Sequence, residues 1–154
     1  MSDPDWHPDP EDGLRGDRLL SEALAPHALG VDEWPDDPGV YVLRCCSPGD
    51  SLESHARRWR DAGYWDTHPD AVPRLAEATR LLYVGSAMNV RSRIEDHVTG
   101  DRHRAAFVSV YPPFDVCLIE WCAPSRCRTV ERQVADELAD KHPEWAVWCD
   151  GVVR

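Results

Sequence analysis

The pattern of apolar and polar positions is clearest between residues 81 and 99. Residues 81–86 begin with an apolar run that predicts a strand, and Gly85 near its end allows a sharp turn. Asn89 then occupies a position suited to a helix N-cap. Apolar residues recur every four positions, at 90, 94 and 98, which predicts a helix over residues 88–99 with one buried stripe.

Basic residues lie on the buried side of this predicted helix. At about 100° per residue, His97 falls on the same face as the apolar stripe and Arg93 falls at its edge. Tyr83 ends the preceding strand close by. A helix that needed only a solvated face would carry its charges on the far side. We therefore predict a functional site that contains these three side chains.

Two more strands and a long helix follow from the same patterning. Residues 39–46 are apolar on both faces, which predicts a buried or central strand, and residues 114–122 predict another. Residues 126–141 predict a second long helix, which ends before a proline. The tail, residues 144–154, holds two tryptophans and is expected to pack back on the sheet.

Glu131 stands out on the predicted helix over residues 126–141. The apolar residues of this helix fill one broad arc, and Glu131 falls near the middle of that arc. A glutamate is rarely buried unless it is paired or binds a metal. Two interpretations stay open: Glu131 holds a metal ion, or it forms a salt bridge with Arg93 or another arginine.

Charge is unevenly distributed along the chain. The formal net charge is −11, and residues 1–38 hold eleven acidic residues and two arginines, a net charge of −9. Residues 39–154 hold seventeen acidic and fifteen basic residues, a net charge of −2. We therefore predict an acidic N-terminal arm over 1–38 and one folded domain over 39–154. The arginines beside the predicted site suit contacts with phosphate groups, and they are Arg91, Arg93, Arg102 and Arg104.

Composition bears on the source of the protein and its compartment. Lys141 is the one lysine among seventeen basic residues, and eighteen of twenty-eight acidic residues are aspartate. This bias is typical of salt-in halophilic microbes, although a high-GC genome also favours arginine over lysine. No apolar run approaches the length of about 18 residues that a membrane span needs, and the N-terminus lacks the features of a signal peptide. We expect a cytoplasmic protein without a membrane partner.

The six cysteines include no Cys-x-x-Cys pair. Reduced thiols are the expectation for a cytoplasmic chain. A zinc site that uses Cys122, Cys127 and a distant histidine is the alternative.

Two short signatures add to this picture. Gly39-Val40-Tyr41 begins the first predicted strand, and Tyr83-Val84-Gly85 ends the second, just before the helix with the Arg-x-x-x-His pattern. In this order the motifs, followed by Glu131 on a later helix, resemble those of the GIY-YIG nuclease family. The resemblance covers roughly residues 38–45 and 81–141. It implies an α/β fold with a small three-stranded, mainly antiparallel sheet flanked by helices.

The resemblance also implies roles for individual residues. Tyr41 would activate the attacking water, and Tyr83 would support the phosphate or the water. Arg93 would neutralise developing charge, while His97 would relay a proton or orient Tyr41. Glu131 would hold the catalytic Mg²⁺ or Mn²⁺. Supporting positions are Gly39, Gly85, Asn89 and His103. The alternative for each tyrosine is a strand-end core residue whose hydroxyl reaches the surface.

More than thirty-five residues separate the two signatures, whereas compact family members join them by a short hairpin. We therefore predict a helical insertion over residues 47–80, with helices over 51–62 and 70–80. Arg57 and Arg58 beside Trp59 suit contacts with the nucleic-acid backbone and bases. A solvated helix face with one buried tryptophan explains these residues equally well.

These observations together favour a metal-dependent DNA endonuclease that hydrolyses phosphodiester bonds in DNA repair, recombination or processing. The partner is DNA. No DNA-reading module is recognisable, so the insertion, the arm or a protein partner would supply specificity. The alternative is a non-catalytic module of the same fold that binds nucleic acid or protein.

Overall fold

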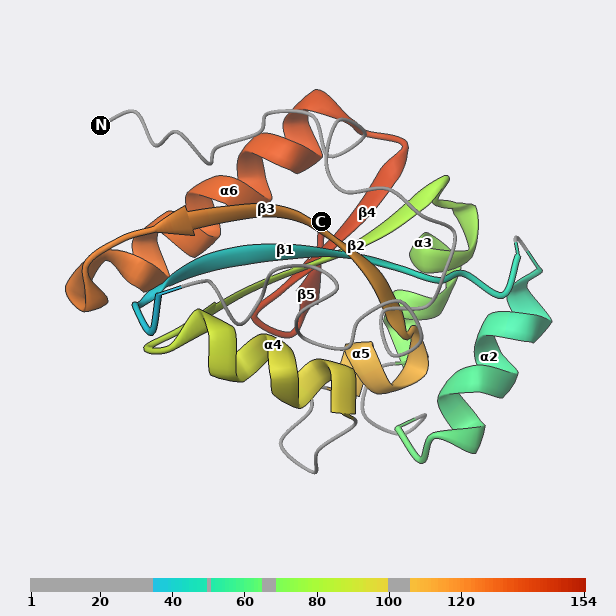
Figure 1. Cartoon of the computed structure of the whole chain (residues 1–154). Helices are drawn as coiled ribbons and strands as arrows, with labels where there is room; N and C mark the ends of the chain where they lie inside the picture. The colour runs from blue at the N-terminus through green and yellow to red at the C-terminus, as the bar shows by residue number, and fades with distance from the viewer. Residues whose placement is uncertain (1–34, 50, 65–68, 100–105) are drawn as a thin grey trace.

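A five-stranded mixed sheet forms the centre of the computed structural model, which describes residues 35–49, 51–64, 69–99 and 106–154 (Figure 1). The spatial order of the strands is β3-β1-β2-β4-β5. Their bounds are β1 Gly39–Cys45, β2 Arg80–Ala87, β3 Pro113–Trp121, β4 Trp145–Cys149 and β5 Val152–Val153. β1 pairs antiparallel with both β2 and β3, β4 lies parallel to β2, and β5 returns antiparallel to β4.

The predicted α/β class with flanking helices is confirmed, but the predicted number of three strands was wrong. The two additional strands come from the tail, which pairs with the sheet at β2. Every residue of Trp145–Cys149 is buried, so β4 lacks the apolar–polar alternation that marks a half-exposed strand. A tight turn joins β4 to β5, with φ of 55° at Asp150 and 78° at Gly151. Asp-Gly is a favoured pair for such a hairpin turn.

Helices cover both faces of the sheet (Figure 1). α6 (Cys127–Lys141) packs on one face, where its apolar stripe meets Val40, Val42, Leu82 and Val84 of the two central strands. The other face is covered by α2 (Leu52–Asp61), α3 (Val72–Glu77), α4 (Val90–Thr99) and α5 (Ala106–Val110). β1 is therefore apolar on both sides because it lies between two helical layers, as its sequence predicts.

The segment between β1 and β2 contains α2, a short 3-10 turn at Pro69–Ala71 and α3. The Ser51 side chain caps α2 by accepting a hydrogen bond of 3.3 Å from the Ser54 N–H. The second predicted helix, over 70–80, is shorter than expected because β2 already begins at Arg80. Trp59 is fully buried, so α2 contributes to the core of the domain.

A buried hydrogen-bond chain ties α2 to α5. Trp59 Nε1 donates to Tyr111 Oη at 2.9 Å, and that hydroxyl lies 2.7 Å from Nδ1 of His55. His55 Nε2 lies 2.7 Å from the carbonyl oxygen of Gly49. An indole N–H can only donate and a carbonyl can only accept. In a neutral His55 ring the proton is therefore on Nε2, and the Tyr111 hydroxyl donates to Nδ1.

Several sequence predictions lie outside the described residues. They are the acidic arm, of which residues 1–34 out of the predicted 1–38 are not described, together with Arg102, His103 and Arg104. Among the residues that are described, no helix is both long and apolar enough to cross a membrane.

Candidate active site

Two tyrosines lie next to each other on neighbouring strands. In the antiparallel pairing of β1 with β2, Tyr41 stands opposite Gly85, and Tyr83 stands opposite Leu43. Both tyrosines belong to the apolar cluster beneath α4 and α5, and their ring centroids are 6.2 Å apart. The strand register therefore brings the tyrosines of the two signatures to the same face of the sheet.

The two signature glycines allow this close packing. A Cβ atom at position 85 would lie 2.6 Å from Tyr41 Oη and 2.7 Å from Tyr41 Cζ. A Cβ atom at position 39 would lie 2.7 Å from the carbonyl oxygen of Glu120 on β3. Both distances are far inside van der Waals contact, so any side chain at Gly39 or Gly85 would displace its neighbours.

Asn89 is the N-cap of α4, as predicted. Its Oδ1 atom accepts a hydrogen bond of 3.0 Å from the Ser92 N–H, and its Nδ2 atom donates to Asp36 at 3.3 Å. This cap determines where the helix begins and thus which residues face the sheet. One consequence is that Arg93 and His97 both point toward the tyrosine pair.

His97 is in direct contact with the tyrosine pair. It is fully buried, and its Nε2 atom lies 2.9 Å from Tyr41 Oη. The His97 ring also meets Tyr83 edge-on, with centroids 5.5 Å apart at an interplanar angle of 70°. The imidazole thus touches both tyrosines and is held by one of them through a hydrogen bond.

Arg93 lies at the edge of the cluster that Tyr41, Tyr83 and His97 form. Its side chain is 24% exposed and forms an ion pair of 3.8 Å with Asp96. Burial raises the pKa of Tyr41 well above its usual value, and the neighbouring Tyr83 raises it further. Arg93 acts in the opposite direction, both by its charge and as a hydrogen-bond donor to Tyr41. The guanidinium is therefore close enough to stabilise negative charge on the Tyr41 oxygen.

Tyr83 has a similar environment. Burial raises its pKa to about 12, with Arg93 lowering it and Glu131 raising it. At neutral pH both tyrosines therefore carry a neutral hydroxyl, which can donate one hydrogen bond and accept others.

Glu131 approaches the tyrosines from α6. It is only 8% exposed, as its position within the apolar arc predicts, and its negative charge raises the pKa of Tyr41 and of Tyr83. Cys149 at the end of β4 lies beside it: burial first, and then the Glu131 carboxylate, raise the pKa of the Cys149 thiol to about 12. In the described part of the chain, no arginine lies within ion-pair distance of Glu131.

Residues 75–142 match the family model of the GIY-YIG catalytic domain. This matched segment, 68 of the 154 residues, has the sequence pattern of the GIY-YIG nuclease family. The match contains Tyr83, Arg93, His97 and Glu131, and the first signature precedes it. The pairing of β1 with β2 nevertheless brings Tyr41 into contact with the matched region. No curated protein and no solved structure shows significant similarity to the chain.

A GIY-YIG catalytic domain indicates a nuclease-type domain, and GIY-YIG nucleases are endonucleases that act on DNA. The arginines predicted to bind nucleic acid are distributed around this domain. Arg91 pairs with Asp36 at 4.0 Å and with Glu95 at 3.5 Å. On α2, Arg57 pairs with Glu53 at 3.3 Å, and Arg58 donates to the carbonyl oxygen of Val110 at 3.4 Å. Arg57 and Arg58 are both exposed.

Two neighbours of the candidate site were not predicted from the sequence. Phe107 of α5 stacks on Tyr83, with centroids 6.1 Å apart at an angle of 20°, and Cys149 lies beside Glu131. The continuous apolar run of β4 and the Asp-Gly turn after it signal the strand that carries Cys149. α5 has only five residues, too few to display a helical period.

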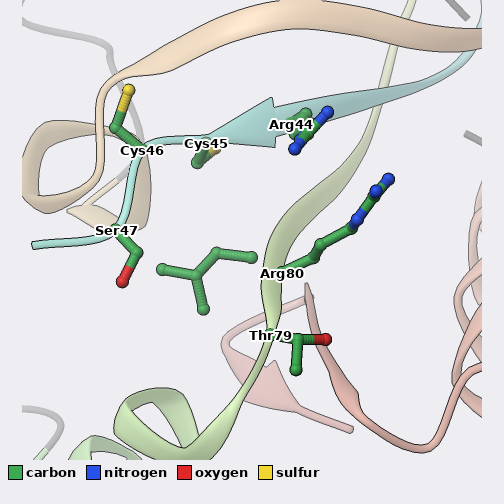
Figure 2. Close-up of a pocket in the computed structure, with 7 residues that line it drawn as sticks. Arg44, Cys45, Cys46, Ser47, Thr79 and Arg80 are labelled. Carbon is green, nitrogen blue, oxygen red and sulfur yellow. The ribbon is translucent and has the colours of Figure 1, made fainter. Parts of the chain in front are cut away.

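A separate cavity of about 260 Å³ opens beyond the tyrosine pair, where β1 ends and β2 begins. Figure 2 shows the guanidinium groups of Arg44 and Arg80 pointing to the same side, away from Cys46 and Ser47. The Ser47 hydroxyl donates to the Gly49 carbonyl at 2.9 Å. This cavity is not lined by any of the candidate site residues Tyr41, Tyr83, Arg93, His97 and Glu131.

Proposed function

We propose that the protein is a metal-dependent DNA endonuclease that hydrolyses phosphodiester bonds in DNA repair, recombination or processing. The observation that carries this proposal is the buried hydrogen bond of 2.9 Å between Tyr41 and His97. This pair lies beside Tyr83 and within electrostatic reach of both Arg93 and Glu131. A cation, a proton acceptor and a carboxylate thus all act on Tyr41 within a nuclease-type domain.

The first step is activation of the attacking water. Because burial favours the neutral form of Tyr41, its hydroxyl is a poor base by itself. His97 Nε2 is positioned to take the Tyr41 proton while the water passes its own proton to Tyr41 Oη. The two residues then act as a relay, and Tyr41 never needs to exist as a free phenolate.

Arg93 supports both the activation of the water and the attack on the phosphoryl group. Its charge already lowers the pKa of both tyrosines, so it stabilises any partial negative charge that develops on their oxygens. The planar guanidinium also matches two phosphoryl oxygens at once, which a single ammonium group cannot do. We therefore assign Arg93 to the phosphoryl group in the transition state.

Glu131 is the proposed ligand for Mg²⁺ or Mn²⁺. One carboxylate suits Mg²⁺, which commonly binds through one or two carboxylates and keeps several of its water ligands. When bound, the ion supplies Lewis-acid polarisation of the phosphate and stabilises the leaving oxygen. The buried position of Glu131, without an arginine partner among the described residues, fits this role better than that of a structural ion pair.

The experiment that tests this function is a cleavage assay on supercoiled, branched and single-stranded DNA, with Mg²⁺ and with EDTA. The expected result is strand scission of at least one substrate in Mg²⁺ and none in EDTA. Tight DNA binding without cleavage in either Mg²⁺ or Mn²⁺ would contradict the proposal and would support the alternative of a non-catalytic binding module.

A further inference from the structure

Two thiols face each other where the chain passes from β3 to α6. The Sγ atoms of Cys122 and Cys127 are 3.4 Å apart. Cys122 follows the last residue of β3 and is half-buried, whereas Cys127 is the first residue of α6 and is buried. A disulfide bond has a sulfur–sulfur distance of about 2.05 Å, so the two atoms need to approach by only about 1.4 Å.

The local backbone holds the thiols in this arrangement. The short 3-10 turn Pro124–Arg126 folds the chain back between them, and the Arg126 N–H donates to the Ala123 carbonyl at 2.9 Å. The Cys127 thiol donates to the Ala123 carbonyl at 3.5 Å, which keeps its sulfur on the inner side of the turn. The Cys122 N–H is tied to the Pro38 carbonyl at 3.2 Å, next to the start of β1.

We propose that Cys122 and Cys127 are a reversible redox pair, which forms an intramolecular disulfide with a small disulfide such as oxidised glutathione. The half-buried Cys122 attacks one sulfur of the oxidant, which forms a mixed disulfide and releases one glutathione thiol. Cys127 then attacks the Cys122 sulfur and releases the second glutathione thiol. The two protein thiols lose two electrons and two protons, and the oxidant gains both.

The environment of Cys122 makes this reaction slow at neutral pH. Burial, followed by the hydrogen bond and charge of Cys127, raises the pKa of the Cys122 thiol to about 12. The attacking species is the thiolate, so the pair is expected to react faster as the pH rises. A zinc ion would need more protein ligands, and the described residues hold no group of three or more histidine, cysteine or acidic side chains that could bind a metal.

The disulfide would join the end of β3 to the first turn of α6. Cys127 precedes Glu131 by four residues, which is about one helical turn. The linkage would therefore hold the end of the helix from which Glu131 projects. This stabilising effect does not depend on nuclease activity.

Peptide mapping of the full-length protein tests the linkage. The reduced protein is incubated with oxidised glutathione, its remaining thiols are alkylated, and the denatured chain is digested with trypsin. Cleavage after Arg126 separates the two cysteines. A disulfide keeps peptide 105–126 joined to peptide 127–128, with a mass two hydrogens below the sum of the two peptides plus one alkyl group on the free thiol of Cys117.

Two variants identify the partner cysteine, because peptide 105–126 also contains Cys117. The linked pair is expected to persist in Cys117→Ala and to vanish in Cys122→Ala. Recovery of peptide 127–128 fully alkylated after oxidation would overturn the proposal. Zinc that co-purifies with the protein and protects both thiols would also overturn it, since the pair would then be metal ligands.

A melting experiment tests the stabilising effect. The disulfide closes the short loop from Cys122 to Cys127. Closing this loop is expected to raise the melting temperature of the oxidised protein by about 4–8 °C over that of the reduced protein. Reduction with dithiothreitol should reverse the shift, and the Cys122→Ala variant should show none. An oxidised protein that carries the linkage but melts at or below the temperature of the reduced form would contradict the stabilising role.

Discussion

The hydroxyl of Tyr41 lies 2.9 Å from Nε2 of His97, although fifty-six residues separate them in the chain. β1 contributes the tyrosine and α4 contributes the histidine, and both side chains are almost completely buried. A hydrogen bond in such a low-dielectric environment is electrostatically stronger than one in water. This pair is the part of the site on which the proposed activation of water depends.

Replacing Tyr41 with phenylalanine is expected to lower the rate of DNA cleavage by about 100-fold or more, because a proton-transfer group is lost while the aromatic ring remains. The measurement is single-turnover cleavage at saturating protein. Tyr64→Phe is the matched control, since Tyr64 is half-buried outside the site. Unchanged cleavage by Tyr41→Phe would remove Tyr41 from the mechanism.

Arg93→Lys is expected to reduce turnover by about 100-fold with little change in DNA affinity, because lysine keeps the charge but lacks the planar pair of donors. Arg128→Lys is the control, because Arg128 is exposed on α6 and is not among the arginines predicted to bind DNA, and it should cleave at a rate close to that of the wild type. If Arg93→Lys weakened binding and left turnover normal, Arg93 would position the substrate and would not stabilise the transition state.

Gly85→Ala is expected to lower the free energy of unfolding by about 1–3 kcal/mol, since the new methyl group would overlap Tyr41 Oη. Urea denaturation followed by tryptophan fluorescence measures this change. Ser86→Ala, at the next position of β2, should have a much smaller effect. Equal stability of Gly85→Ala and the wild type would mean that the strand pair accommodates a side chain at this position.

High pH is expected to destabilise the fold through Tyr83. Its pKa is about 12 in the folded protein and about 10 in an unfolded chain, so only the unfolded chain loses this proton between those values. The contribution of Tyr83 to the free energy of unfolding is fully present below pH 10 and declines as the pH rises toward 12. Denaturation curves at several pH values give the free energy of unfolding as a function of pH. Between pH 10 and pH 12 this free energy should fall less steeply in Tyr83→Phe than in the wild type, by about 1.4 kcal/mol per pH unit. Identical slopes would contradict the burial of the phenol.

The N-terminal residues offer a test of long-range electrostatics. Residues 1–34 hold nine acidic residues and two arginines, a net charge of −7. Deleting them is expected to tighten DNA binding at low salt, with the difference shrinking near 1 M salt, where the Debye length is about 3 Å. The deletion keeps Asp37, whose carbonyl accepts the Val90 N–H at 3.1 Å. Equal affinities of both proteins at low salt would show that this charge does not affect binding.

Short-range patterns were sufficient to locate most of the candidate site. The four-residue spacing of apolar positions on α4 and α6 placed His97 and Glu131 on buried faces, and the structure confirms both positions. The apolar residues on both faces of β1 likewise predicted a buried or central strand. These features depend on neighbours within a few residues, which a single sequence displays directly.

The strand count could not be deduced in the same way. β4 pairs in parallel with β2, more than sixty residues earlier in the chain, and an apolar run such as Trp145–Cys149 is compatible with a strand or a buried helix. The contact of Cys149 with Glu131 depends on that pairing, so it was not predictable without the sheet. The tautomer of His55 likewise follows only from its tertiary hydrogen bonds.

The most direct test of the central claim is the Mg²⁺ dependence of DNA cleavage by the wild type, Glu131→Gln and Glu137→Gln. Glutamine is nearly isosteric with glutamate, so α6 should fold normally in both variants, while only Glu131→Gln loses the proposed ion ligand. Glu137 pairs with Lys141 near the far end of α6 and serves as the matched control. We expect wild-type cleavage by Glu137→Gln and almost none by Glu131→Gln at any Mg²⁺ concentration up to tens of millimolar. A Glu131→Gln protein that cleaves DNA at the wild-type rate with the same Mg²⁺ dependence would contradict the central claim.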